Sequence, residues 1–225
     1  MGNKLYAESK IELTPVIARH YDLIMNSISF GKYDRFIGQA VKDMDIRPGD
    51  RILDLGCGSG KNAALMKEYI GKDGRILGLD LSPVMERQFL AKHKGDERIS
   101  FIRQRVDIPF DLGQRFDKVV ISFVIHGFPQ EVREQMIRNA KTHLKPGGKL
   151  IILDWSEFSL EQMPGHHRLI FKTVECVYAF DFIERDWKSI LKQFGFDAFS
   201  EKFYFREYAR LLISTKAHPS VNTGR

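Results

Sequence analysis

The sequence predicts one α/β domain built on a doubly wound, mostly parallel sheet of seven strands, closed by an antiparallel C-terminal hairpin. Three observations lead to this fold class. Short apolar runs alternate with helical segments and turns five times between residues 51 and 155. The first of these runs leads into a glycine-rich turn. With 43% apolar residues, a chain of 225 residues can bury a full core.

The N-terminal residues 1–47 are expected to form a helical lid. Residues 14–29 have helical character, which Gly31 ends, and the next apolar residues share one face of a second helix: Tyr33, Phe36, Ile37, Ala40, Val41 and Met44. Tyr21 has two interpretations. It is a core residue, or it covers the ligand site and is then a candidate cofactor-binding and catalytic residue.

Residues 51–60, Arg-Ile-Leu-Asp-Leu-Gly-Cys-Gly-Ser-Gly, combine a short buried strand with a turn that has glycine at every second position. Backbone without side chains lets a ligand approach closely. A dinucleotide-binding turn has the spacing G-x-G-x-x-G, but Lys61 stands where its third glycine belongs. The spacing is therefore G-x-G-x-G, and Asp54 lies two residues before the first glycine.

A second acidic residue supports a ligand site at this turn. The next predicted strand ends at Asp80, which follows Gly60 by 20 residues. A carboxylate at that strand end can accept hydrogen bonds from both hydroxyls of a ribose. The alternative interpretation is an ordinary strand-to-helix turn.

The remaining elements follow from apolar spacing and from turn residues. We expect a helix at 61–70, a strand at 75–80, a helix at 83–94, strands at 99–103 and 116–123, a helix at 129–143, a strand at 149–155, a helix at 184–194 and hairpin strands at 196–204 and 207–215. Ser82 and Pro83 should begin the second of these helices as N-cap and N1. Residues 48–155 form the cofactor-binding half, and residues 156–225 form a substrate-side segment with the closing hairpin.

Several polar side chains fall at predicted strand ends. Asp107 either accepts a hydrogen bond from an adenine amino group or is an exposed turn residue. Ser122 and His126 lie at or just beyond the end of the fourth strand. The adjacent His166 and His167 cannot both face one metal ion from a regular element, so we interpret them as surface residues.

The composition argues against several classes of site and of protein. The two cysteines, Cys57 and Cys176, form no zinc motif or disulfide framework, which fits a reducing cytoplasm. The longest apolar run, residues 119–125, is too short to span a bilayer, and residues 1–10 lack the apolar core of a signal peptide. The net charge of +6 permits attraction to nucleic acid or to an anionic membrane, although the basic residues are scattered as on a solvated surface.

The glycine turn with Asp54, the Asp80 strand end, residues 109–110, residues 116–123 and the Leu-Lys-Pro-Gly-Gly of residues 144–148 together resemble the class I S-adenosylmethionine-dependent methyltransferases. These have a Rossmann-like fold. Within that superfamily, residues 21–22, residues 29–31 and the Ser-Phe pair at 122–123 resemble the ubiquinone/menaquinone biosynthesis C-methyltransferases. The chain departs from that family at Cys57, where alanine or glycine is usual, and at His126-Gly127, where an Arg-Asn pair is usual. These departures concern the substrate more than the cofactor.

The resemblance implies residue roles toward S-adenosylmethionine. Asp54 and Cys57 belong to the glycine motif, and Ser122 would bind the amino-acid moiety. The other implied contacts are Gly56, Gly58, Ser59 and Gly60 with the methionine end, Asp80 with the ribose, Leu81 and Met85 with the adenine faces, and Asp107 and Ile108 with the adenine edge. No metal ion is expected.

The acceptor implied by the resemblance is a small apolar aromatic molecule, such as a demethylated quinol methylated on a ring carbon. An aromatic-rich stretch from Phe158 to Phe182 could line its pocket, or could simply cover the sheet. His126 is a candidate general base if a hydroxyl proton must leave. An isoprenoid tail on the acceptor would bring a cytoplasmic enzyme to the inner membrane surface.

Two other functions fit the same cofactor half. One is an N- or O-methyltransferase for a lipid or another small molecule, and the other is a non-enzymatic S-adenosylmethionine-binding module. A nucleic-acid methyltransferase is not expected, because the chain has no Asn/Asp-Pro-Pro-aromatic motif after the fourth strand and no Pro-Cys nucleophile. The oligomeric state does not follow from the sequence.

Overall fold

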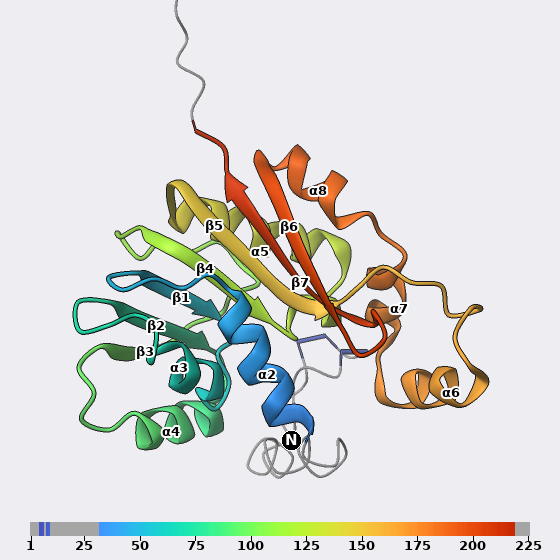
Figure 1. Ribbon diagram of the computed structural model, residues 1–225, viewed down its shortest axis with the longest axis horizontal. Helices are drawn as coiled ribbons and strands as arrows, with labels where there is room; N and C mark the ends of the chain where they lie inside the picture. The colour runs from blue at the N-terminus through green and yellow to red at the C-terminus, as the bar shows by residue number, and fades with distance from the viewer. Residues whose placement is uncertain (1–4, 7, 10–31, 219–225) are drawn as a thin grey trace, which may run out of the picture.

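The computed structural model describes residues 5–6, 8–9 and 32–218 (Figure 1). Within this part of the chain the strands are β1 (Arg51–Leu55), β2 (Arg75–Asp80), β3 (Ile99–Arg103), β4 (Phe116–Ser122), β5 (Leu144–Trp155), β6 (Phe196–Tyr204) and β7 (Ala209–Lys216). The helices are α2 (Lys32–Asp43), α3 (Lys61–Met66), α4 (Pro83–Lys92), the 3-10 helix η1 (Ile125–Gly127), α5 (Gln130–His143), α6 (Gly165–Val174), α7 (Val177–Ile183) and α8 (Trp187–Gln193).

The strands form one sheet in the order β3-β2-β1-β4-β5-β7-β6. Strands β1 to β5 are parallel to one another, and β7 is antiparallel to both β5 and β6. The predicted doubly wound sheet with its antiparallel hairpin is therefore confirmed. Since β1 and β4 are neighbours, the turns that follow them meet at the carboxyl edge of the sheet, where such folds bind ligands.

Alternating side chains of the strands supply two cores, one on each face. Leu53 and Val119 belong to the core that α5, α7 and α8 complete. Their neighbours Ile52 and Val120 belong to the core that α2, α3 and α4 complete (Figure 1). Covering on both faces explains why the central strands are apolar almost throughout. None of the described helices is both long and apolar enough to cross a membrane.

Three predicted boundaries differ from the structure by about three residues or more. The first crossover helix, expected to reach Ile70, ends at Met66, because the amides of Glu68 and Tyr69 donate to carbonyls three residues back and Gly71 takes a positive φ of 66°. Strand β5 starts at Leu144 instead of Lys149 and pairs with β4 through an irregular register. The helix expected at 184–194 is α8 alone, which begins at Trp187 because the Asp186 side chain accepts a hydrogen bond from the Ser189 amide and caps it.

Candidate active site

The glycine turn leaves β1 in a conformation that only glycine adopts without strain. Gly56, Gly58 and Gly60 have φ angles of 78°, 53° and 78°. A Cβ atom on Gly56 would lie 2.6 Å from a methyl carbon of Val124, so the turn packs directly against the segment that follows β4. A Cβ atom on Gly58 would meet no atom within 4 Å. The middle of the turn therefore offers bare backbone and open space to a ligand.

Asp80 ends β2 and reaches the same turn. One of its carboxylate oxygens accepts a hydrogen bond from the Gly58 amide at 3.0 Å, and the other accepts one from the Ser82 amide at 2.8 Å. Ser82 in turn caps α4, because its hydroxyl accepts from the Met85 amide at 3.4 Å. Desolvation raises the pKa of Asp80, while these amide bonds oppose the shift. The carboxylate is thus aimed and fixed before any ligand arrives.

Asp54 is a buried carboxylate for which neither oxygen has a hydrogen-bond partner among the described residues. Burial, assisted by repulsion from Asp80, raises the pKa of Asp54 to about 7. A buried polar group without a partner is costly. A ligand with a cationic or hydrogen-donating group near β1 would relieve that cost.

The other predicted cofactor residues differ in exposure. Leu81 and Ile108 are exposed and Met85 is buried, so the first two present apolar surface at this edge. Ser59 is buried and its hydroxyl accepts a hydrogen bond from Lys92. The Cys57 thiol is buried against Gly78, which raises its pKa well above the usual value, so Cys57 contributes its backbone to the turn.

Asp107 already has protein partners. Its carboxylate forms an ion pair with Arg105 at 2.6 Å and accepts a hydrogen bond from the Tyr6 hydroxyl at 2.8 Å. Burial raises its pKa, but these two partners outweigh burial and the net pKa is lowered. A ligand amino group would therefore share the Asp107 carboxylate with Arg105 and Tyr6. Ser122 is half-buried at the end of β4, and Tyr21 lies outside the described residues.

His126, in η1, is held between two carboxylates. Its Nδ1 lies 2.7 Å from Asp154 at the end of β5, and its Nε2 lies 3.4 Å from Glu175 at the end of α6. Burial opposes protonation, but the two acids dominate and raise the pKa of His126 to about 10. The ring is therefore an imidazolium near neutral pH, whereas the general base considered from the sequence requires neutral imidazole.

Arg133, on α5, holds the segment around His126 in place. Its guanidinium donates to the backbone carbonyls of Ile125, His126 and Tyr178, and pairs with Asp181. The side chain is fully buried. It therefore ties η1 to α7.

Six aromatic side chains gather beyond the ends of β4 and β5; we call them the aromatic wall: Phe123, Trp155, Phe158, Phe171, Phe180 and Tyr208. The Trp155 ring lies 5.8 Å from Phe123 and 5.2 Å from Phe171, measured between ring centres. Phe158 continues the contact to Phe171 at 5.5 Å and to Tyr208 at 5.1 Å. The indole N–H of Trp155 is buried and has no acceptor among the described residues.

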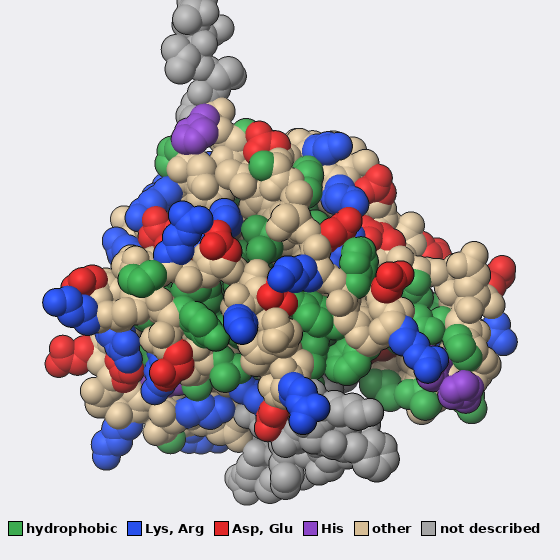
Figure 2. Space-filling view, in the orientation of Figure 1, with side chains coloured by type: hydrophobic (Ala, Val, Ile, Leu, Met, Phe, Trp, Pro, Cys, Tyr) green, Lys and Arg blue, Asp and Glu red, His purple; other side chains and the backbone are tan. Residues whose placement is uncertain are grey.

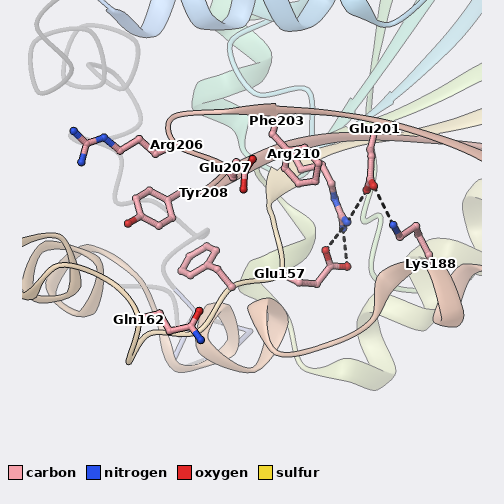
Figure 3. Close-up of a pocket in the computed structure, with 10 residues that line it drawn as sticks. Glu157, Gln162, Lys188, Glu201, Phe203, Arg206, Glu207, Tyr208 and Arg210 are labelled. Carbon is pink, nitrogen blue, oxygen red and sulfur yellow. Dashed lines mark hydrogen bonds and ion pairs between the residues drawn. The ribbon is translucent and has the colours of Figure 1, made fainter.

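A cavity of about 350 Å³ lies beside the wall, between the segment after β5 and the β6–β7 hairpin (Figure 3). Phe158 and Tyr208 line one part of it. The other part is charged: Arg210 pairs with Glu157 and, at 3.3 Å, with Glu201, which also pairs with Lys188 at 3.0 Å (Figure 3). The open space at Gly58 and this cavity thus occupy different parts of the carboxyl edge.

Comparison with known proteins identifies the family of this chain. Residues 7–188 match the ubiE/COQ5 methyltransferase family. The chain belongs to this family. A demethylmenaquinone methyltransferase of Staphylococcus carnosus is 28% identical over 177 residues, which are 78% of this chain and 72% of that protein.

Solved methyltransferase structures share the fold. A putative O-methyltransferase of Nostoc punctiforme superposes with a TM-score of 0.68 at 19% identity, covering 90% of this chain and 59% of the other. A SAM-dependent methyltransferase of Aquifex aeolicus gives a TM-score of 0.59 at 16% identity, covering 80% and 89%. This ubiE/COQ5-family chain is thus an S-adenosylmethionine-dependent methyltransferase with a class I fold.

The geometry of the methyltransferase fits its methyl donor. S-adenosylmethionine carries an ammonium group, a sulfonium and a ribose diol. The unpartnered Asp54 carboxylate, the aimed Asp80 carboxylate and the open backbone at Gly58 lie at one turn and suit such a ligand.

Sequence reasoning missed three residues that hold His126 and the segment around it: Arg133, Asp154 and Glu175. Asp154 carried a usable signal, since it comes at the end of a predicted strand just as Asp80 does. Arg133 and Glu175 carried none, because their charged partners, Asp181 and His126, lie 48 and 49 positions away in the sequence. His166 is exposed as predicted, whereas His167 is half-buried beside the Tyr208 hydroxyl, at 3.5 Å.

Proposed function

We propose that this methyltransferase transfers a methyl group to a ring carbon of a demethylated quinol, the reduced form of a demethylmenaquinone-like molecule. The aromatic wall is the observation that carries the proposal, because five of its six side chains are only half-buried and could offer apolar surface to a flat aromatic acceptor. The N–H of Trp155, which has no acceptor among the described residues, could donate to a ring oxygen of that acceptor. The name of the Staphylococcus carnosus relative supports the same acceptor class.

On the donor side, the residues at the glycine turn would divide the cofactor between them. Asp80 would accept hydrogen bonds from the ribose hydroxyls, and the backbone around Gly58 would lie against the methionine part. Asp54 would face the positive charge of that part. Leu81 and Met85 would flank the adenine, whose edge would meet Ile108 and Asp107, and Ser122 would lie near the amino-acid group.

The bound donor supplies a methyl group that its sulfonium has already activated. In the transfer, a bond forms between the methyl carbon and the ring carbon while the bond to sulfur breaks and leaves S-adenosylhomocysteine. The ring carbon then releases its proton to solvent. The protein mainly aligns the acceptor in line with the methyl group and excludes water. The His126 imidazolium, held by Asp154 and Glu175, would fix the end of α6 against η1 and so position the acceptor side.

An acceptor panel tests the proposal. Single-turnover reactions with S-adenosylmethionine would contain demethylmenaquinol, phosphatidylethanolamine, small amines or catechols, and products would be identified by mass. We expect a gain of one methyl group on demethylmenaquinol. If a nitrogen or oxygen acceptor is methylated and demethylmenaquinol is not, the proposal of a quinol acceptor is wrong. Donor binding without transfer to any acceptor in the panel would leave the proposal without support.

A further inference from the structure

Helix α6 presents an apolar face to solvent. Leu169, Ile170 and Val174, with exposed fractions of 69%, 60% and 57%, are the most exposed large apolar side chains among the described residues. Val177, at the start of α7, adds a fourth at 49%. A contiguous exposed apolar surface of this kind marks an interaction site more often than isolated exposed residues do.

Phe171 anchors α6 to the methyltransferase. Its side chain is buried and contacts Trp155 and Phe158 of the aromatic wall. Helical spacing puts Leu169 and Ile170 about 160° and about 100° around the helix from Phe171, whereas Val174, one turn further on, lies nearer to it. The exposed apolar side chains therefore border the buried one, and within the part of the chain that the structure describes Leu169, Ile170 and Val174 stay exposed. Figure 1 shows α6 at the outer margin of the molecule, beyond the end of β5.

The charged side chains on α6 itself are basic. Residues 162–174 contain no aspartate or glutamate, and α6 carries Arg168 and Lys172 one turn apart together with His166 and His167. Figure 2 shows basic and histidine side chains beside hydrophobic ones over α6. Apolar side chains bordered by cations are the pattern of a helix that lies in the interface of an anionic membrane. A protein partner would not by itself require cations on this helix.

We propose that α6 docks the enzyme on an anionic lipid surface, with Leu169, Ile170 and Val174 among the acyl chains and Arg168 and Lys172 at the lipid phosphates. Because Phe171 joins the same helix to the aromatic wall, docking would set the acceptor side of the site at the membrane surface. The link to a lipid-soluble acceptor rests on the proposed function, whereas the docking itself does not.

Vesicle sedimentation with the full chain tests the docking. Wild-type protein should bind vesicles of phosphatidylglycerol and phosphatidylcholine, bind pure phosphatidylcholine at least tenfold more weakly, and lose affinity as salt rises. The double variant Leu169→Glu/Ile170→Glu should bind the anionic vesicles at least tenfold more weakly. The control Leu90→Glu, at a position on α4 that is 52% exposed, should bind like wild type. Thermal unfolding checks that each variant is folded.

The double variant Arg168→Gln/Lys172→Gln tests the charge separately. It should lose most of the preference for anionic vesicles while keeping the weak binding to phosphatidylcholine. Wild-type protein that ignores anionic vesicles, or a folded Leu169→Glu/Ile170→Glu variant that binds them unchanged, would overturn the proposal. So would a variant that loses only self-association, because the face would then join two copies of the chain.

Two forms of the acceptor separate this inference from the proposed function. With a short-tailed demethylnaphthoquinol in buffer, Leu169→Glu/Ile170→Glu should turn over like wild type; with a long-tailed acceptor in anionic vesicles, it should be at least tenfold slower. If wild type methylates neither acceptor but binds vesicles, the quinol proposal fails and the docking stands. If the variant methylates both as wild type does and still binds vesicles, the docking fails and the quinol proposal stands.

Discussion

Three aspartates near strand ends show how surroundings give the same side chain different properties. Asp54 is buried with no hydrogen-bond partner among the described residues, and its pKa rises to about 7. Asp80 is half-buried, and two backbone amides hold it toward the glycine turn. Asp154 is paired with the His126 imidazolium. The first two suit a ligand that brings positive charge and hydroxyl groups, and the third belongs to the protein's own framework.

Replacing Asp80 should weaken donor binding. Asp80→Ala removes an ionised acceptor, and hydrogen bonds to a charged group contribute roughly 1.5–3 kcal/mol, so the Kd for S-adenosylhomocysteine should rise at least about tenfold. Isothermal titration calorimetry measures this. Asp73→Ala, in the exposed turn before β2, is the matched control and should leave the Kd unchanged. An Asp80→Ala protein with wild-type affinity would remove Asp80 from the donor site.

The His126 cluster should make stability depend on alkaline pH. The pKa of His126 is about 10 in the folded chain and near 6.5 when unfolded, so its contribution is complete below pH 6.5 and is lost as pH rises toward 10. Relative to His126→Gln, wild type should lose an advantage on the order of 4 kcal/mol across that window. Urea unfolding of both proteins at pH 6, 8 and 10 measures it. An advantage that stays constant from pH 6 to 10 would contradict the imidazolium.

The same imidazolium predicts the kinetic effect of His126. His126→Ala should lower turnover without changing the Kd for the donor, because the residue positions the acceptor side. A general base would instead give wild-type kcat an ascending limb near pH 6.5 that the variant lacks. We expect no such limb from His126 in a pH profile between 5.5 and 8.5. An ascending limb that is present in wild type and absent in His126→Gln would instead indicate that His126 acts as a general base.

At the scale of elements, the glycine turn depends on two different properties of glycine. Gly56→Ala adds a side chain 2.6 Å from Val124 to the strain of a positive φ and should cost more than about 2 kcal/mol of folding stability. Gly58→Ala meets open space and should cost about 1–2 kcal/mol, yet it should weaken S-adenosylhomocysteine binding. Gly49→Ala, also at positive φ in open space but outside the turn, controls for strain alone. If Gly58→Ala and Gly49→Ala bind S-adenosylhomocysteine equally well, the ligand does not lie against Gly58.

Local patterns predicted the elements that local interactions determine. The apolar runs of β1, β2 and β4 and the Ser82 cap of α4 are of this kind, and both are confirmed. Helices α6 and α7 were not predicted. In α6 the apolar Leu169, Ile170 and Phe171 are consecutive, so its apolar residues spread around the helix and hide its period. The His126–Glu175 contact joins residues 49 positions apart, and no sequence pattern of either residue points to it. Sequence therefore predicted individual residues for the candidate donor side, and only an aromatic-rich stretch for the candidate acceptor side.

At the scale of the whole molecule, we propose that the donor lies at the glycine turn and that an aromatic acceptor lies at the aromatic wall. The two tryptophans of the chain allow acceptor binding to be followed by fluorescence. Trp155 belongs to the wall, whereas Trp187 is buried and stacked on Phe182. Trp187→Phe keeps an aromatic ring in that stack and leaves Trp155 as the only indole.

The decisive measurement is the fluorescence of Trp155 in the Trp187→Phe protein, titrated with short-tailed demethylnaphthoquinol while S-adenosylhomocysteine is saturating. Free N-acetyltryptophanamide, titrated in parallel, corrects for absorption by the quinol. We expect quenching that saturates with the quinol concentration and exceeds that of the free indole. Quenching that only matches the free indole, in a protein that methylates the same quinol, would place the acceptor away from the aromatic wall.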